Sequence, residues 1–309
     1  MQLYEIISSN KSAVWHSLID FRSNISRNDI WRPIDDVQFV FLCGANIAKD
    51  NPSKRRKLLL EFSTKNLPYA KFFLAESIFE IIKSEGVNTN LLDIENDISK
   101  FADYIILVLE SESTFCELGA FATNDNLRGK LIVINDRKHQ DADSFINLGP
   151  IKAISERSND NVIYYKMEGE GKIFGDGIGE TFSKLYQLIH KNPSTRRTRI
   201  TEFNPKEYFT KDGLRFLHDL IYFSGPISLP ELSRVIKVLF PSGREKNIYK
   251  HLGLLCATKQ IQQSRNSKNN LYSSLYDKPF FEYSYDIHKL MVAFKTLYYR
   301  YDRTRLKWN

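Results

Sequence analysis

The sequence predicts an α/β fold, a doubly wound and mostly parallel five-stranded sheet, followed by a small C-terminal winged helix-turn-helix domain. From residue 36 to residue 190, short apolar runs alternate with amphipathic stretches, as strands alternate with helices in such folds. The runs are apolar throughout rather than at every second position, which indicates strands covered on both faces. After residue 205, three helical patterns precede a basic hairpin, the order of a winged helix. A chain of 309 residues is long enough for two such domains.

The sheet domain is expected over residues 36–192, after a helical lead-in over residues 1–35 that carries no motif. Its five candidate strands are rich in Val, Ile, Phe, Tyr and Leu, and they lie at 36–44, 69–77, 103–111, 130–136 and 161–167. Helical patterns lie between and after them, at 54–66, 90–101, 114–126 and 178–190.

A linker is expected over residues 193–205, because prolines, polar residues and a cluster of arginines interrupt the pattern there. The winged-helix domain then covers residues 206–309. Its elements are expected as helices at 211–223, 228–238 and 243–257 and a hairpin at 260–276. A last, aromatic helix at 286–301 packs either on this domain or on a second copy of the chain. We expect an oligomer, which the second arrangement would form.

The net charge changes sign along the chain. Residues 196–309 contain 21 Lys and Arg against 10 Asp and Glu, whereas residues 1–195 contain 23 against 27. A distinct basic module indicates an anionic partner, and nucleic acid is the first candidate. The candidate contact residues lie in the third helix and the wing: Arg244, Lys246, Lys250, Arg265 and Lys268. The alternative is a basic face that serves only solubility. A second basic run, KRRK at 54–57, is expected at a solvated helix start.

Membrane association, metal binding and disulfide bonding are not expected. The longest apolar runs, at 39–43 and 104–109, are strand-sized and fall far short of the roughly 20 residues that a membrane span needs. The N-terminus has no secretory signal pattern, so the expected location is the cytoplasm. The three cysteines are widely spaced, and the six histidines form no cluster with metal-ligand spacing. We therefore expect no metal and no other cofactor.

The most informative segment is ADYIILVLESESTFCELGAFATNDNLRGKLIVIND at 102–136. A strand ends at Leu109, and a helix is expected to begin near Ser113 or Thr114 with Glu117 in its first turn. Ligands of parallel sheets bind at the carboxyl ends of the strands, so this turn is where a site is expected. Two interpretations of Glu117 remain open here. Thr114 and Glu117 have the spacing of a capping box, and Glu117 is also placed to act on a ligand.

The run ESEST-FCELGAFA at 110–122 resembles the nucleoside 2-deoxyribosyltransferase-like superfamily, and the first strand running into CGAN at 43–46 is similar to that family's opening strand and substrate-side turn. The resemblance covers about residues 36–190. It implies the same fold and makes Glu117 the nucleophile that attacks the sugar anomeric carbon and releases the base. It also implies substrate contacts from two turns, at Gly44, Ala45, Asn46, Ser113 and Thr114.

The same resemblance places an assisting acid near Asp97, with Glu95 and Asp93 as alternatives. The chain departs from the family in the turn before the helix. Glu110 and Glu112 occupy positions where members of the family often have Pro, Gly or Asp. This departure leaves the identity of the assisting carboxylate open.

The complete arrangement, this domain followed by a winged helix, is similar to the effectors of type II retron defence systems. The resemblance implies a toxin that hydrolyses the N-glycosidic bond of a nucleotide or of NAD. It also implies that a reverse transcriptase and its branched RNA–DNA hold the toxin inactive until phage infection. Two alternatives are a nucleotide-sensing DNA-binding regulator without catalysis and a phosphoribohydrolase of the lysine-decarboxylase-like class. The second usually has a PGGxGT-like run, which this chain lacks at 110–114.

Overall fold

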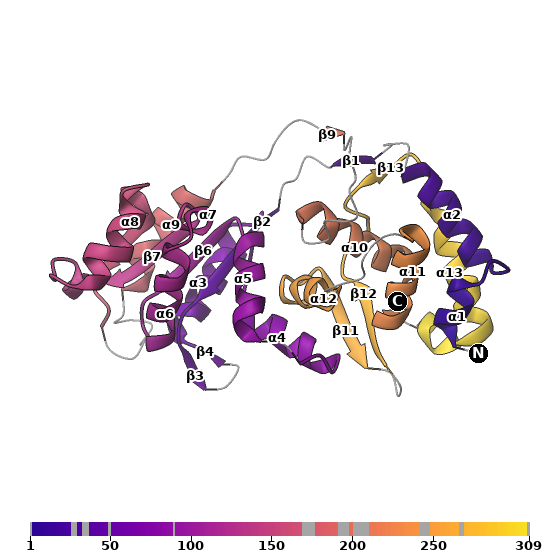
Figure 1. Ribbon diagram of the computed structural model, residues 1–309, viewed down its shortest axis with the longest axis horizontal. Helices are drawn as coiled ribbons and strands as arrows, with labels where there is room; N and C mark the ends of the chain where they lie inside the picture. Colours follow the sequence, from indigo (N-terminus) through magenta and orange to yellow (C-terminus); the bar gives the residue numbers. More distant parts are fainter. Residues whose placement is uncertain are drawn as a thin grey trace. The chain divides into compact units, whose positions relative to one another are not determined.

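The computed structural model describes residues 2–25, 30–32, 37–48, 51–88, 90–168, 177–190, 198–199, 210–241, 248–265 and 269–307. The chain divides into two compact units, which Figure 1 shows in the colours of the sequence. The sheet unit contains residues 35–77 and 89–193. The winged-helix unit contains residues 1–34, 78–88 and 194–309.

The sheet unit has a five-stranded sheet in the order β5-β2-β6-β7-β8, and every neighbouring pair is parallel. The strands are β2 (Gln38–Cys43), β5 (Ala70–Phe73), β6 (Tyr104–Val108), β7 (Leu131–Asp136) and β8 (Val162–Tyr165). All six residues of β2 and all six of β7 are buried, because helices cover both faces of the sheet. The prediction of a doubly wound parallel sheet is confirmed.

Alternate residues of β2 show the two covered faces. Val40 and Leu42 belong to a core cluster with residues of α3 (Lys54–Asn66) and α9 (Phe182–Ile189). On the opposite face, the Phe39 ring packs on Phe101 of α5 (Leu91–Phe101), with ring centroids 4.8 Å apart. α6 (Glu112–Ala122) also packs on β6. The smaller elements of this unit are β3 (Asn46–Ala48), β4 (Asn51–Pro52), α7 (Asp125–Arg128), α8 (Lys152–Ser155), one π-helical turn (Asn147–Ile151) and short 3-10 helices at Arg137–His139, Asn159–Asn161 and Ile178–Thr181.

The candidate strand at 69–77 is too long. β5 ends at Phe73, and α4 (Ala75–Ser84) begins two residues later. The apolar run of the strand continues directly into the apolar face of the helix. Ile78 and Ile82 recur at helical spacing on that face, and both are fully buried.

The winged-helix unit has the expected element order. It contains α10 (Lys211–Ser224), β10 (Ile227–Ser228), α11 (Leu229–Leu239), α12 (Ile248–Ala257), β11 (Ile261–Arg265) and β12 (Asn270–Ser274). The strands form an antiparallel sheet in the order β10-β12-β11. The predicted winged helix is therefore confirmed.

The chain ends complete this unit. α1 (Leu3–Ser8), α2 (Ala13–Ile25) and α13 (Ile287–Tyr301) pack with α10 and α11. Phe21 is fully buried against the rings of Phe216, Phe223, Tyr283 and Tyr285. Three short strands, β1 (Ile30–Arg32), β9 (Thr198–Arg199) and β13 (Glu282–Tyr283), pair antiparallel, and a 3-10 helix follows at Arg303–Lys307. Among the helices in the described ranges, none is long and apolar enough to cross a membrane.

Candidate active site

The candidate site lies at the carboxyl ends of three adjacent strands, β5, β2 and β6. In chain order these strands give the sheet order 2-1-3-4-5, so the chain reverses direction of winding between β2 and β6. Ligands of open α/β sheets bind at such a switch point. The turn after β2, the start of α4 after β5 and the turn after β6 all contribute side chains there.

A buried arginine organises the turn after β2. Arg56 of α3 is 1% exposed and donates to the Leu42 carbonyl (3.1 Å) and to both carboxylate oxygens of Glu76 (2.8 and 3.0 Å). It also donates to the Asn46 Oδ1 (2.8 Å). A Cβ at Gly44 would lie 2.6 Å from the Arg56 Cδ, so this position requires glycine. The expectation of a solvated helix start at KRRK is wrong for Arg56.

Glu110 holds the same turn from the end of β6. Its Oε1 accepts hydrogen bonds from the Ala45 amide (3.0 Å) and the Ser53 hydroxyl (2.6 Å), and its Oε2 accepts one from Arg55 (2.9 Å). The Glu110 side chain is only 3% exposed. The residue that departs from the family pattern therefore joins the carboxyl ends of β2 and β6.

The helix that carries Glu117 begins earlier than expected. Its N-cap is Ser111, whose amide donates to the Thr114 Oγ1 (3.2 Å). Thr114 is fully buried, and its hydroxyl also donates to the Ser111 carbonyl (2.7 Å). The capping box therefore joins Ser111 and Thr114, and the capping interpretation of Glu117 is wrong. Glu117 lies in the second turn of the helix, so its carboxylate does not cap the amides at the start of the helix.

The Glu117 carboxylate is half-buried next to the end of β2. Among the described residues, its Oε2 atom is buried and has no hydrogen-bond partner. Burial, and then the charge of Glu95, raises the pKa of Glu117 to about 7. The Cys43 thiol hydrogen-bonds the same carboxyl, and burial followed by the Glu117 charge raises the pKa of Cys43 well above its usual range.

Two further carboxylates border this group. Glu95 extends from α5, and burial, and then the charge of Glu76, raises its pKa. Glu76 has a lowered pKa because the Arg56 hydrogen bonds outweigh the effect of burial. Glu76, Glu95 and Glu117 thus interact through their charges, and the buried guanidinium of Arg56 is hydrogen-bonded to Glu76. Such a cluster of carboxylates favours binding of a partly cationic group.

The acid expected at Asp97 is two residues from Glu95 on the same helix, and two residues correspond to a rotation of about 200°. The largest effect of a charge on the Glu117 pKa comes from Glu95. Asp93 is exposed. Of the predicted substrate-binding residues, Gly44, Ala45 and Asn46 lie in the turn that Arg56 and Glu110 organise, and Ser113 is exposed at the start of α6.

Sequence reasoning did not find Arg56, Glu76 or the role of Cys43. A signal was present for Glu76, since it follows the second strand directly and the carboxyl ends of parallel strands meet at one edge. No local signal marks Arg56, because its partners come from three other elements.

The predicted nucleic-acid residues are placed only in part. Lys250 of α12 is buried, with 8% exposure. Arg265 ends β11 and is exposed. Arg244, Lys246 and Lys268 lie outside the described residues.

Comparisons with known proteins place this architecture in a family. The family model described as STM3845 retron effector protein matches residues 51–263. The candidate ribosyltransferase/DNA-binding protein of retron Ec73 from Escherichia coli is 41% identical over an alignment of 311 positions, which covers 97% of each chain. The chain belongs to the retron effector family. Its relative from retron Ec86 of Escherichia coli, also named a candidate ribosyltransferase/DNA-binding protein, is 37% identical over 140 residues, 45% of each chain.

The family match spans both units of this retron effector. Residues 51–263 include α3 with Arg56, α5 with Glu95 and α6 with Glu117, and they continue into the winged-helix elements as far as β11.

Proposed function

We propose that this retron effector cleaves the N-glycosidic bond of a nucleotide or of NAD, with Glu117 as the nucleophile. The observation that carries the proposal is the Glu117 carboxyl itself. It lies at the switch point of the sheet, next to Glu95 and Cys43, and has a buried oxygen without a partner among the described residues. The names of the relatives, which include ribosyltransferase, support the same class of chemistry.

In the proposed reaction, a Glu117 oxygen forms a bond to the sugar C1′ as the bond from C1′ to the base nitrogen breaks. The electron pair of the broken bond leaves with the base. The sugar carries positive charge in the transition state, and the surrounding carboxylates stabilise that charge. Water then attacks C1′ as the bond from C1′ to the Glu117 oxygen breaks. The water gives one proton to the assisting carboxylate, and the Glu117 carboxylate is released.

Glu95 is the proposed assisting acid, in preference to Asp97. Burial, and then the charge of Glu76, raises the pKa of Glu95. The carboxyl can accept a hydrogen bond from a sugar hydroxyl and, when protonated, donate to the departing base. Arg56 is a positioning residue, because it holds Glu76 and the turn at Gly44 and Ala45 rather than a reacting atom.

The proposed control is through a nucleoprotein. Relatives are named as retron proteins and as DNA-binding proteins, and residues 196–309 of this chain are strongly basic. We propose that a reverse transcriptase and its branched RNA–DNA bind the winged-helix unit and hold the enzyme inactive.

The test is base release by the purified protein from NAD, nucleoside monophosphates and deoxynucleosides, measured by chromatography. Glu117→Gln preserves the size of the side chain but removes the nucleophilic charge, so release should fall by at least about three orders of magnitude. Thermal stability should not decrease, because the folded protein disfavours an ionised carboxyl at this position. Glu112→Gln, on the exposed face of the same helix, is the matched control and should retain the wild-type rate.

Retained release by Glu117→Gln would reject the proposed nucleophile. A wild-type protein that binds nucleotides tightly without releasing base from any of them would instead be a nucleotide-sensing regulator.

A further inference from the structure

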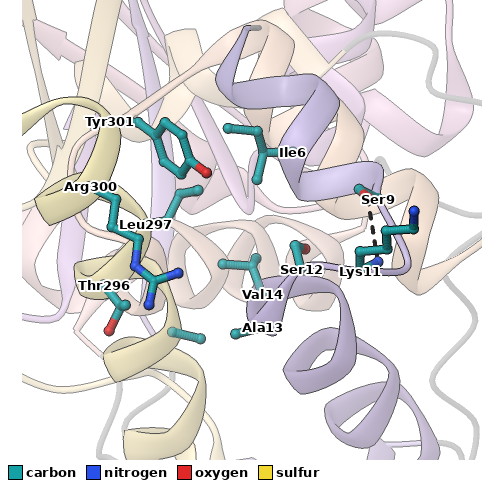
Figure 2. Close-up of a pocket in the computed structure, with 11 residues that line it drawn as sticks. Ile6, Ser9, Lys11, Ser12, Ala13, Val14, Thr296, Leu297, Arg300 and Tyr301 are labelled. Carbon is teal, nitrogen blue, oxygen red and sulfur yellow. Dashed lines mark hydrogen bonds between the residues drawn. The ribbon is translucent and has the colours of Figure 1, made fainter.

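A pocket lined by both polar and apolar residues in the winged-helix unit lies outside both the candidate active site and the wing. It has a volume of about 250 Å³ and lies between the α1–α2 turn and the last turns of α13. Figure 2 shows side chains from both segments around it. Its lining residues include two cations, Lys11 and Arg300, and no carboxylate. A pocket lined in this way favours an anionic ligand.

The cations are available for such a ligand. Arg300 and Lys11 are exposed, and within the described part of the chain neither side chain has an ion-pair partner. In Figure 2, the Arg300 guanidinium extends from α13 toward Ala13 and Val14, and Lys11 lies on the far side of the pocket. A guanidinium with free donors is the side chain best matched to phosphate oxygens.

The start of α2 adds backbone donors to the same pocket. Ser12 precedes this helix of thirteen residues, and its hydroxyl accepts the Trp15 amide (3.0 Å). The amides of Ala13 and Val14 precede that bond and have no acceptor within the helix, because the first turn of a helix leaves its amides unpaired. Both residues line the pocket, so the positive end of the helix dipole lies beside Arg300.

Aromatic rings border the cationic side. Tyr299 and Tyr301 are each 57% exposed at the end of α13, and Tyr301 lines the pocket. The Arg303 guanidinium carbon lies 4.5 Å from the centroid of the Tyr299 ring. Exposed aromatic rings alternating with arginines are typical of surfaces that bind single-stranded nucleic acid, where bases stack on rings and cations contact phosphates.

We propose that this pocket binds a phosphate of a single-stranded nucleic-acid segment. Arg300 and the first amides of α2 hold the phosphate, Lys11 on the far side of the pocket contacts a neighbouring phosphate of the strand, and the Tyr301 ring stacks on an adjacent base. The site is separate from the wing and does not depend on catalysis by Glu117.

The test measures binding of a fluorescently labelled single-stranded DNA to the full chain by anisotropy. Arg300→Glu should raise Kd by about tenfold or more, because it removes a charge-assisted contact and adds repulsion. Tyr301→Leu should also weaken binding, through loss of stacking. Lys295→Glu makes the same charge change on α13, rotated by about 140°, and should raise Kd by less than about twofold.

Salt dependence and competition give a second measurement. Arg300→Gln should reduce the slope of log K against log salt by about 0.7, the value for one phosphate contact on a single strand. Equal binding by wild type and both Arg300 variants, each with a wild-type melting temperature, overturns the proposal. The proposal is also overturned if inorganic phosphate or a mononucleotide displaces the labelled strand as effectively as the unlabelled strand does. The pocket would then be a site for small anions. Base release without nucleic acid should be unchanged in every variant, which keeps this test independent of the proposed catalysis.

Discussion

At the scale of single residues, the titration of Glu117 follows from its neighbours. The carboxyl is half-buried, has Glu95 as a nearby like charge, and accepts a hydrogen bond from the Cys43 thiol, a weak donor. Its Oε2 has no partner among the residues that the structure describes. Arg56, whose charge lowers the Glu117 pKa, donates its hydrogen bonds to Glu76 and to backbone carbonyls instead. Glu117 is therefore left with a pKa of about 7, so its charge changes around neutral pH.

This environment predicts the pH dependence of the reaction. A nucleophilic carboxylate must be ionised, so kcat/KM for base release should rise with pH and reach half of its plateau near pH 7. In Glu95→Gln, the like charge that raises the pKa of Glu117 is absent, so this midpoint should move to lower pH. Asp97→Asn is the matched control on the same helix and should leave the midpoint unchanged. A midpoint that moves in Asp97→Asn but not in Glu95→Gln would assign the assisting role to Asp97.

At the scale of elements, the start of α6 shows how a side chain's task depends on where the helix begins. Ser111 and Thr114 form the cap, so Glu117, three residues after Thr114, takes no part in capping the helix. The sequence alone does not decide between Ser111, Ser113 and Thr114 as the cap, because Ser and Thr are both favoured there.

The cap predicts a difference between two neighbouring hydroxyls. Thr114→Val keeps the shape of a fully buried side chain but removes the acceptor of the Ser111 amide, so the free energy of unfolding should fall by about 1–2 kcal/mol. Ser113→Ala, at an exposed position, should change it by less than about 0.5 kcal/mol. Urea unfolding at constant pH measures both. Equal stability of Thr114→Val and wild type would show that another group caps α6.

The strands and most of the helices followed from periodicity, because burial on both faces forces a continuous apolar run. The boundary between β5 and α4 did not, since residues of both periods overlap there without a Gly or Pro. The Glu117 position followed from a local motif. Its relation to Glu95 and Arg56 did not, because those contacts join segments far apart in the sequence and depend on the sheet order.

At the scale of the whole molecule, the two ends of the chain belong to one unit. The N-terminal residues, expected as a lead-in to the sheet domain, pack with the winged helix through Phe21. The C-terminal segment is fixed there as well, since Arg305 donates to both oxygens of Glu231 (2.7 and 2.8 Å) at the start of α11. The winged-helix unit thus contains both ends of the chain in addition to the three helices and the hairpin.

This packing predicts that Phe21 stabilises the winged-helix unit. Phe21→Ala removes a fully buried ring from a cluster of four aromatic neighbours, so it should lower the free energy of unfolding by about 3–5 kcal/mol. Phe145→Ala is the matched control, because that ring is 84% exposed and should contribute little. Chemical denaturation monitored by circular dichroism measures both. A Phe21→Ala protein as stable as wild type would show that the N-terminal helices add no stability to the unit.

The distribution of charge over the whole chain predicts how the effector binds duplex DNA. Residues 196–309 have an excess of Lys and Arg, whereas residues 1–195 have an excess of Asp and Glu, so contacts to phosphates should come from the winged-helix unit. Binding should weaken steeply with salt, because each phosphate that the protein neutralises releases condensed counterions. Arg265 is exposed at the end of β11, where a wing approaches the backbone, so Arg265→Glu should raise Kd and lower the salt slope by about 0.9 for each phosphate that the variant no longer neutralises. Lys278→Glu reverses a charge in the same unit but outside the hairpin strands, and it should change both quantities less. If Arg265→Glu binds duplex DNA with wild-type affinity and salt slope, the wing does not contact the duplex, and the basic excess acts through another face of the unit.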